Sequence, residues 1–370
     1  MLRGEAEIVA WARLLHMADA IFWDEAPMAH RHCHEAVGRC LRDIIGNNVP
    51  WGGKIIVMGS NFRQILPVVR KGTRGQVVSA CVNQSPPWRG VRLLELTTNV
   101  RVLRAGMDDS RLLDFCAWQM RIGNGVEEDA RGSSVDSFAE RLVRISDDLI
   151  VAGEDRRDRI NAVFPNVGAF GPHVDREARL AFTRRSVRAP RNDDQRHLNE
   201  DIVRRVSPEE FESLSVDGTV DMDSSVIYPG EFLQALTPAG MPTHRVVLKV
   251  GAPFMLLRTI NPSTGLFNGM RCLLITASQL VVHVEIATGP NTRQRAFVPL
   301  CKLTSSEGEL PFVLTRRQFP VAPCFAMTIN KAQGRTLDRV GIFLRRPVFS
   351  HEQSCMWLRL RPYRGRISCL

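Results

Sequence analysis

Apolar and polar positions alternate in blocks along the first part of the chain. Residues 5–18 place Ile8, Trp11, Ala12 and Leu15 on one stripe at helical spacing. Three short apolar runs each stop at a polar cluster: 20–23 at Asp24-Glu25, 54–58 at Gly59-Ser60-Asn61, and 91–96 at Thr97-Thr98-Asn99. Helical patterns at about 29–46 and 74–84 separate them. This alternation predicts parallel strands joined by helical crossovers.

The three polar clusters are expected to share one place in the fold. In an open α/β sheet, the ligand crevice lies beyond the carboxyl ends of the strands. We therefore predict that the clusters after these three runs converge on one site.

The remainder of the chain shows both helical patterns and patterns of short strands. A helical pattern at 107–123 is followed by a stretch, 124–180, that we interpret as linker and peripheral helices. Residues 186–203 predict a strand and a helix joined by the turn Pro190–Asp193. Short strands at 245–250, 254–258, 271–276, 280–285 and 296–300 predict a small β module within about 205–320. The last α/β piece predicts strands at 324–329 and 339–344.

Composition narrows the class of protein. The 370 residues suffice for two domains, and 44% hydrophobic with 24% charged residues is a soluble globular composition. The net charge of +10 suits a polyanion, nucleic acid first and an anionic membrane second, although a basic surface without a partner is the alternative. Nine cysteines without a CxxC pair disfavour a disulfide framework or zinc ribbon and suit the cytosol or nucleus. No apolar run approaches the ~20 residues that span a bilayer.

The adjacent acids Asp24 and Glu25 are the first candidate for chemistry. They close a hydrophobic strand, where two carboxylates are costly unless they bind something. Asp24 would hold Mg²⁺ through water, and Glu25 would orient and deprotonate an attacking water. The alternative is a helix N-cap, which Asp24 serves alone.

Polar residues after the next two runs could complete a nucleotide site. Asn61, Arg63 and Gln64 follow the second run, where an amide can sense a γ-phosphate. Arg101 follows the third run, and its guanidinium suits bidentate phosphate binding. For each residue, the alternative is a solvated loop position.

Other groupings carry weaker signals. His30, His32, Cys33 and His34 are grouped like metal ligands, but only His30 and His34 share a helix face. The arginines at 184, 185, 188 and 191 line either a DNA path or a solvated basic face. The tryptophans at 11, 88 and 118 are predicted to be core residues.

Seven stretches of this sequence together resemble the motifs of one family, in the family's order. They are FWDEAPMAH (22–30), GSNFRQILPVV (59–69), LTTNVRV (96–102), APRN (189–192), GAPFMLLRTINPSTGLFNG (251–269), FAMTINKAQGRTL (325–337) and PVFSH (347–351). The chain resembles the superfamily-1B DNA helicases of the petite-integration-frequency (Pif) type, in the branch carried by Helitron transposons. The resemblance extends to about Gln353.

The resemblance implies an α/β fold with two RecA-like P-loop NTPase lobes, the first incomplete, and an SH3-like β insertion in the second. The expected boundaries are 1–104 for the first lobe, 105–180 for a linker with peripheral helices, and 181–353 for the second lobe with its insertion at about 205–320. Residues 354–370 are expected to be a tail foreign to the fold.

The implied function is that of an ATP-dependent 5′-to-3′ DNA helicase, with ATP and Mg²⁺ as cofactors and single-stranded DNA and duplex junctions as partners. The family pattern makes Asp24 and Glu25 the metal and general-base pair. Gln64 and Arg101 contact the γ-phosphate, and Gly334 belongs to the nucleotide site. Thr328, Asn330, Lys331 and Gln333 touch DNA. No membrane is implied, and the expected location is the nucleus, with the mitochondrion as the family's alternative.

The sequence departs from the family at three places. GxxxxGK[ST] is absent, and the chain is expected to be truncated ahead of Met1. Asn61 stands where the family has an aspartate, which puts efficient hydrolysis in doubt. After Gln353 the family pattern returns only if the reading frame moves by one base, so we hypothesise a frameshift at about residue 354 and the loss of an arginine finger. The alternative function is therefore a non-catalytic single-stranded DNA-binding remnant of a transposon helicase.

Overall fold

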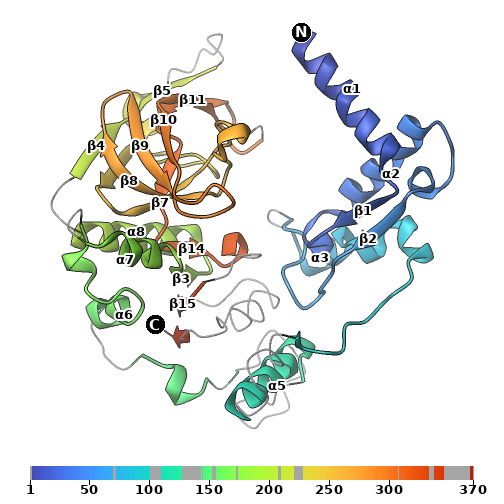
Figure 1. Cartoon of the computed structure of the whole chain (residues 1–370), viewed down its shortest axis with the longest axis horizontal. Coiled ribbons are helices and arrows are strands. Elements are labelled where there is room, and N and C mark those ends of the chain that lie inside the picture. The colour runs from blue at the N-terminus through green and yellow to red at the C-terminus, as the bar shows by residue number, and fades with distance from the viewer. Residues whose placement is uncertain are drawn as a thin grey trace. The chain divides into compact units, whose positions relative to one another are not determined.

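The computed structural model describes residues 2–69, 72–100, 110–126, 143, 145–151, 156–171, 174–206, 210–220, 228–306, 308–332, 337–345 and 367–369. The chain divides into two compact units (Figure 1). The first covers the described residues up to Val143, and most of the second is the described stretch from 145 to 345.

The first unit is built on a two-stranded parallel sheet. Its elements are α1 (Leu2–Met17), β1 (Ala20–Trp23), α2 (Arg31–Ile45), β2 (Ile55–Met58), α3 (Arg74–Ala80) and α5 (Ser110–Asn124). The strands pair from Ala20↔Ile55 to Trp23↔Met58. Local sequence explains the helix ends: Gly46 closes α2 with φ 75°, and Thr73 begins α3 with a capping box. The two predicted strands and their helical crossover are confirmed.

The third predicted strand of this unit is wrong. Residues 91–99 have no regular structure, and the exposed fractions of Leu93, Leu94 and Leu96 are 68%, 78% and 99%. A strand is stable only when a neighbour satisfies its backbone groups, and no described strand pairs with this run. Apolar content alone therefore did not make it a strand.

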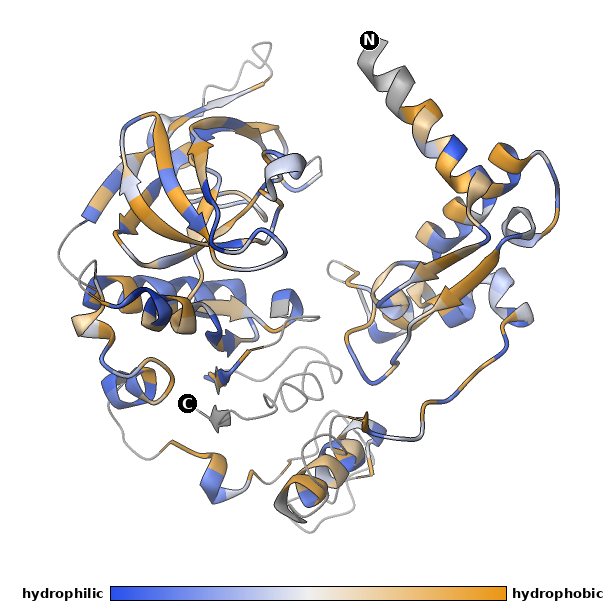
Figure 2. Ribbon diagram, in the orientation of Figure 1, coloured by the Kyte–Doolittle hydropathy of each residue, from blue (hydrophilic) through white to orange (hydrophobic). Residues whose placement is uncertain are grey.

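Much of the apolar surface of the first unit is exposed. Both strands are hydrophobic along their length (Figure 2), yet Phe22 is 78% and Ile55 63% exposed. The helix predicted at 5–18 is present as α1, but Ile8 and Trp11 of its stripe are 69% and 64% exposed. The prediction that Trp11 is a core residue is therefore wrong, because most of its side chain is exposed.

The second unit contains a parallel sheet of order β14-β3-β15-β16. Its strands are β3 (Arg185–Ala189), β14 (Ala326–Thr328), β15 (Arg339–Ile342) and β16 (Ile367–Cys369). The strand–turn–helix predicted at 186–203 is confirmed as β3 followed by α8 (Asn192–Arg205). Residues 367–369 lie within the predicted foreign tail and pair with β15, whereas the other residues of that tail lie outside the description.

Helices before β3 contribute to the core of this unit. They are α6 (Arg156–Val163) and α7 (Arg176–Thr183). Phe164 is fully buried, lies 5.4 Å from the Phe325 ring centroid and stacks near Phe182. The sequence assigned these residues to a linker with peripheral helices, because their mixed charges concealed a few large aromatic side chains that pack inward.

A module of antiparallel strands lies between β3 and β14 in the chain, as the short-strand texture predicted. It holds a five-stranded sheet of order β10-β9-β8-β7-β13, a three-stranded sheet β11-β12-β5, and the pair β4-β6. The elements are β4 (Glu210–Leu214), β5 (Val216–Thr219), α9 (Gly230–Ala235), β6 (Arg245–Lys249), β7 (Pro253–Leu256), β8 (Arg271–Ala277), β9 (Val281–Ile286), β10 (Arg295–Pro299), β11 (Cys301–Thr304), β12 (Leu314–Gln318) and β13 (Val321–Pro323). Alternating side chains such as Val282, Val284 and Val298 fill its core.

In the parts of the chain that the structure describes, no helix has both the length and the apolar character needed to cross a lipid bilayer.

Candidate functional site

The candidate site begins where β1 ends. Asp24 is exposed, and its Oδ1 accepts a hydrogen bond from the Glu25 backbone N–H at 2.9 Å. Glu25 has φ 52° and ψ 37°, a left-handed conformation that is uncommon outside glycine. The chain then enters a short 3-10 helix, Ala26–Met28. The acid pair therefore forms a tight turn rather than the N-cap of a long helix, which was the alternative.

Backbone hydrogen bonds join this turn to the loop after β2. The Gly59 N–H donates to the Trp23 carbonyl at 2.8 Å, and the Ala26 N–H donates to the Gly59 carbonyl at 3.0 Å. A Cβ placed on Gly59 would lie 2.9 Å from Asp24 Oδ1. The first two polar clusters thus converge as predicted, and glycine at position 59 leaves room for the Asp24 carboxylate.

The segment after Gly59 is shaped by Asn61. Its Oδ1 accepts from the Arg63 N–H at 3.1 Å, and its carbonyl accepts from the Gln64 N–H at 2.9 Å. The Arg63 Nε donates to Asn124 Oδ1 of α5 at 2.5 Å. Asn61 is thus a turn residue and Arg63 ties the loop to α5, while Gln64 is left half-buried.

His34 of α2 contacts the tight turn formed by Asp24 and Glu25, which is named the acid turn. Its Nε2 lies 3.1 Å from the Ala26 carbonyl, and its ring centroid lies 4.1 Å from that of Trp23. Its Nδ1 is buried without a hydrogen-bond partner in the described chain. Burial lowers the pKa of His34, which favours the neutral ring with the proton on Nε2. Sequence reasoning considered this histidine only as a metal ligand and missed this contact.

The neighbouring histidines do not form a metal site with it. The His30 Nδ1 accepts from the His32 N–H at 3.2 Å and so caps α2, and His32 Nδ1 lies 3.0 Å from Glu35. Within the described ranges, no three His, Cys, Asp or Glu side chains are grouped to hold a metal ion.

The chemistry of the acid turn fits a Mg²⁺ ion held partly through water. Asp24 has one oxygen engaged by its own turn, and its Oδ2 has no partner among the described residues. Mg²⁺ binds through one or two carboxylates and keeps several waters, which suits an exposed Asp beside a half-buried Glu.

The predicted third cluster lies elsewhere. The Asn99 amide is 4.0 Å from Cys116 Sγ in α5. Arg101, predicted to contact the γ-phosphate, lies outside the described residues. The predicted convergence therefore holds for the clusters after β1 and β2.

The predicted DNA contacts lie in the second unit at the carboxyl end of β14. Thr328 is paired with Ala189 of β3, and the Ile329 N–H donates to the Ala189 carbonyl at 3.2 Å. Asn330 and Lys331 begin a 3-10 helix immediately afterwards, with the Lys331 side chain exposed. Gln333 and Gly334 lie outside the described residues.

Two amides of α8 hold this strand, and sequence reasoning missed both. Asn199 Nδ2 donates to the Ala326 carbonyl at 2.9 Å, and Asn199 Oδ1 accepts from the Ala326 N–H at 2.8 Å. Gln195 Nε2 donates to the same carbonyl at 3.2 Å. The only sign of these contacts in the sequence is that Gln195 and Asn199 are four residues apart and so lie on one face of the helix.

Of the predicted arginine path, two members make internal contacts. Arg184 Nε lies 2.6 Å from Asp338, and Arg185 Nη1 donates to the Val163 carbonyl at 3.4 Å. Burial lowers the pKa of Arg185, and the neighbouring Arg339 adds to that effect. Arg184 and Arg185 thus make contacts within the second unit, while Arg184 and Arg191 are exposed, and the DNA path stays a prediction.

Comparison with known proteins assigns two segments. Residues 7–133 match the family described as PIF1-like helicase, and residues 231–277 match the 2B domain of DNA helicase Pif1. A stretch of 130 residues, 32% of this chain, is 37% identical to the human ATP-dependent DNA helicase PIF1. That stretch covers 18% of the human protein.

Solved structures agree with this chain in fold. Two coordinating Pif1 helicases at forked dsDNA give a TM-score of 0.63 at 18% identity, covering 97% of this chain and 70% of that one. The Bacteroides Pif1 helicase in complex with ADP-AlF3 and ssDNA gives 0.62 at 16% identity, covering 97% and 72%. The predicted α/β class with parallel sheets is confirmed.

Proposed function

We propose that this chain, related to the Pif1-like DNA helicases through residues 7–133 and 231–277, descends from an ATP-dependent 5′-to-3′ DNA helicase. Its first unit corresponds in this proposal to part of one RecA-like lobe. Its second unit corresponds to the other RecA-like lobe with an SH3-like insertion. The observation that carries the proposal is the Asp24–Glu25 turn, hydrogen-bonded to the loop after β2 at the carboxyl ends of two parallel strands.

The acid turn has the geometry for work on a nucleotide. Asp24 presents a free carboxylate oxygen that can hold Mg²⁺ through water, and Glu25 is placed beside it to orient and deprotonate the attacking water. Bound Mg²⁺ supplies charge neutralisation at the phosphate oxygens. Gln64 and Arg101 are proposed to contact the γ-phosphate.

Single-stranded DNA is the proposed partner of the second unit. Thr328 ends a strand of the parallel sheet, and Asn330 and Lys331 follow it, so that a hydroxyl, an amide and an ammonium group follow one another along the chain. Such donors suit phosphates and sugars. Gln333 belongs to the same proposed contact and Gly334 to the nucleotide site. The relative in complex with ssDNA supports this assignment.

Turnover by these 370 residues alone is expected to be near background. They contain no GxxxxGK[ST] sequence, so no lysine loop cradles the phosphates. An arginine finger is worth roughly 10³–10⁵ in rate at related sites, and no family-like finger motif occurs here. The alternative proposal is a non-catalytic single-stranded DNA-binding remnant of a transposon helicase.

Metal binding tests the acid turn directly. Mn²⁺ in the presence of ATP is titrated by electron paramagnetic resonance into the chain and into Asp24→Asn. We expect the variant to lose binding at least several-fold, because its amide carries no charge. Asp43→Asn, an exposed acid of α2, is the matched control and should bind as the parent does. Equal binding by Asp24→Asn would remove the basis of the proposal.

A gain-of-function experiment distinguishes the helicase proposal from the non-catalytic alternative. A strand–GxxxxGK[ST]–helix segment is joined ahead of Met1, a family segment that carries the arginine finger replaces residues 354–370, and DNA-stimulated ATP hydrolysis is measured. We expect activity to appear and to be abolished by Glu25→Gln. If DNA binding is retained and no ATPase appears, the non-catalytic alternative stands.

The cellular assignment follows from the same relationship. We propose a nuclear protein of a Helitron-type element, with the mitochondrion as the alternative compartment. Imaging of a fluorescently tagged chain tests it, and exclusion from both organelles would reject it.

A further inference from the structure

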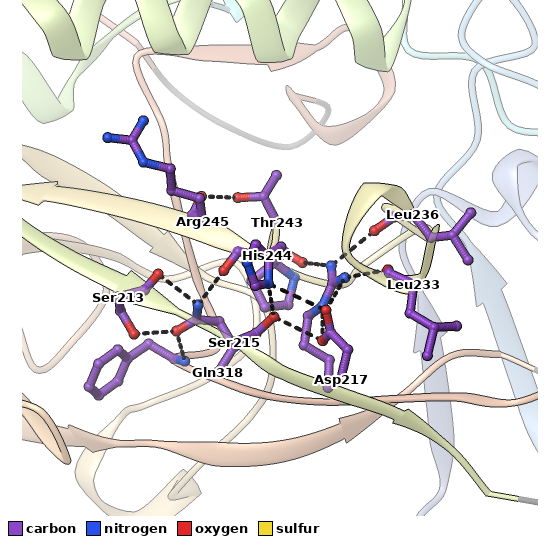
Figure 3. Close-up of polar contacts among 12 residues, drawn as sticks. Ser213, Ser215, Asp217, Leu233, Leu236, Thr243, His244, Arg245 and Gln318 are labelled. Carbon is purple, nitrogen blue, oxygen red and sulfur yellow. Dashed lines mark hydrogen bonds and ion pairs between the residues drawn. The ribbon is translucent and has the colours of Figure 1, made fainter. Parts of the chain in front are cut away.

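One face of the three-stranded sheet β11-β12-β5 contains a buried ion pair. Arg316 of β12 and Asp217 of β5 are directly opposite, are 0% and 2% exposed, and meet at 2.7 Å. The Arg316 guanidinium also donates to the carbonyls of Leu233, Leu236 and Pro242 at 2.9–3.0 Å (Figure 3). These contacts fix α9 and the following loop against the sheet.

The other face of the same sheet carries exposed basic side chains, although Thr315 in its middle strand is buried. By register, Lys302, Arg317 and Val216 form one row across the three strands. Thr304, Thr315 and Gly218 form the next row. Because successive side chains on a strand alternate between faces, both rows point away from the buried Arg316. Lys302, Arg317 and Thr304 are exposed. This outer face is called the basic sheet face below.

Two like charges face each other on the basic sheet face. Directly opposite cations in neighbouring strands destabilise a sheet. Neither Lys302 nor Arg317 has an acidic partner among the described residues. The acid Glu212 on the adjoining strand is engaged by Arg245 at 2.6 Å. The sheet thus carries a cation pair that its own fold does not require.

A third cation and one exposed hydroxyl extend this face. Arg258, exposed after β7, donates to the Thr304 carbonyl at 3.3 Å, so its guanidinium lies beside the second row. Thr304 brings an exposed hydroxyl, the neighbouring Thr315 is buried, and Gly218 leaves the third position of that row flat. Cations with hydroxyl donors on a flat surface match the groups that contact the DNA backbone.

We propose that the basic sheet face binds the sugar-phosphate backbone of duplex DNA, with Lys302 and Arg317 contacting phosphates. Single strands are usually held by aromatic stacking platforms, and neither row contains an aromatic side chain. A flat, basic surface without stacking groups suits the regular backbone of a duplex. The identity of the polyanion rests on the proposed function, whereas the surface itself does not depend on nucleotide chemistry.

Salt dependence of DNA binding tests the proposal on the intact chain. Fluorescence anisotropy with a 20-base-pair duplex and a 20-nucleotide single strand is followed from 50 to 200 mM salt for Lys302→Ala/Arg317→Ala. Each lost phosphate contact changes the slope of log K against log salt by about 0.9, so the duplex slope should become shallower by about 2. Single-strand affinity should change less than about threefold, because Lys331 and its neighbours are untouched.

The matched control removes the same charge elsewhere in the second unit. Arg204→Ala/Arg295→Ala takes two exposed arginines from α8 and β10 and should leave the duplex slope unchanged. The proposal is overturned if the control shifts the slope as much, if the test pair leaves it unchanged, or if single-strand binding falls equally.

A second variant separates binding from folding. Arg317→Glu puts a carboxylate opposite Lys302, so the melting temperature should stay level or rise while duplex affinity falls about tenfold. Weaker binding with a lower melting temperature would mean a structural role and reject the proposal. If Asp24→Asn does not weaken Mn²⁺ binding, the proposed function fails, but a shallower duplex slope would still support binding at the basic sheet face. If the chain binds Mn²⁺ with ATP and the duplex slope is unchanged in Lys302→Ala/Arg317→Ala, only the duplex-binding proposal is rejected.

Discussion

Individual contacts of the acid turn decide how its carboxylates are presented. Gly59 touches Asp24, and His34 supports Ala26 through its Nε2. Neither residue would coordinate a metal. Both act by holding the turn in its left-handed conformation at Glu25, where a non-glycine residue is otherwise disfavoured. The proposed metal site therefore depends on residues other than its carboxylates.

Substitution of Gly59 tests the first of these contacts. The Cβ of Gly59→Ala would lie 2.9 Å from Asp24 Oδ1, so the carboxylate or the loop must move. We expect Mn²⁺ affinity to fall several-fold and stability to fall by about 1–3 kcal/mol. Calorimetric titration and urea unfolding measure the two. Gly90→Ala meets nothing within 4 Å and should change neither; a silent Gly59→Ala would refute the crowding argument.

The lowered pKa of His34 predicts a pH dependence of stability. The unfolded chain binds the proton more tightly than the folded one, so folding is favoured above the ordinary histidine pKa of about 6.5. The contribution should be lost as pH falls below that value. Thermal unfolding between pH 7.5 and 5 is expected to show a smaller drop for His34→Phe. His16→Phe, at an exposed position, should keep the parental drop, and a parental drop in His34→Phe would contradict the assignment.

Single side chains also lock whole elements together in the second unit. Arg316 joins β12 to β5 and α9, and Asn199 joins α8 to β14 through both backbone groups of Ala326. A buried group with several partners leaves all of them unsatisfied when it is removed. Each of these two residues should therefore matter more than its apolar neighbours.

Removal of Arg316 is expected to unfold part of the β module. Arg316→Ala removes the guanidinium from the buried Asp217, which keeps only Ser215 and His244 beside it, and breaking such a buried pair costs about 3–5 kcal/mol. Urea unfolding monitored by circular dichroism measures this cost. Arg317→Ala, the adjacent exposed arginine, should lie within about 0.5 kcal/mol of the parent. Similar losses in both variants would contradict the two-face description of β12.

Asn199 allows a finer test of an element contact. Asn199→Asp keeps the acceptor for the Ala326 N–H and loses the donor to its carbonyl, whereas Asn199→Ala loses both. We expect Asn199→Ala to lose more, about 1–3 kcal/mol, because it leaves the Ala326 N–H unpaired, whereas in Asn199→Asp the Ala326 carbonyl keeps its hydrogen bond from Gln195. Urea unfolding of the chain gives the comparison, with Arg204→Ala on the same helix as a neutral control. No loss in Asn199→Ala would show that the amide does not hold β14.

At the scale of the whole molecule, apolar burial is unequal between the units. The large buried clusters described here lie in the second unit, whereas exposed apolar side chains gather on α1, β1 and β2 of the first. Since hydrophobic burial is the main favourable contribution to folding, the first unit should be the less stable. The two units are then expected to unfold separately.

Tryptophan fluorescence can follow the first unit in the intact chain. Tryptophans at 11, 23, 51, 88 and 118 all precede the second unit. We expect the fluorescence midpoint in urea to lie below the circular-dichroism midpoint of the strand-rich second unit. Coincident midpoints would indicate one cooperative unit, and Arg316→Ala, which should lower only the second midpoint, serves as the control.

Sequence reasoning succeeded where the signal was local. Periodicity located β1, β2, α2, α8 and most strands of the module, because these patterns depend on neighbouring residues. It failed at 91–96, where strand formation needs a partner strand, and at Phe164 and Phe170, whose burial needs distant helices. At the candidate site, it predicted that the clusters at Asp24-Glu25 and Gly59–Asn61 converge, which the structure shows, but it missed the contacts of His34 and Asn199, which join separate elements.

The sequence by itself determined which residues could carry chemistry: an acid pair after a hydrophobic strand, amides after the next, and an excess of arginine and lysine. The tertiary structure decided what adjacent, chemically identical residues do. Arg316 and Arg317 are the same amino acid at successive positions, yet one is fully buried against Asp217 and the other is exposed opposite Lys302. Strand pleating turns successive side chains to opposite faces, but only the packing of α9 against one face determines which is inside.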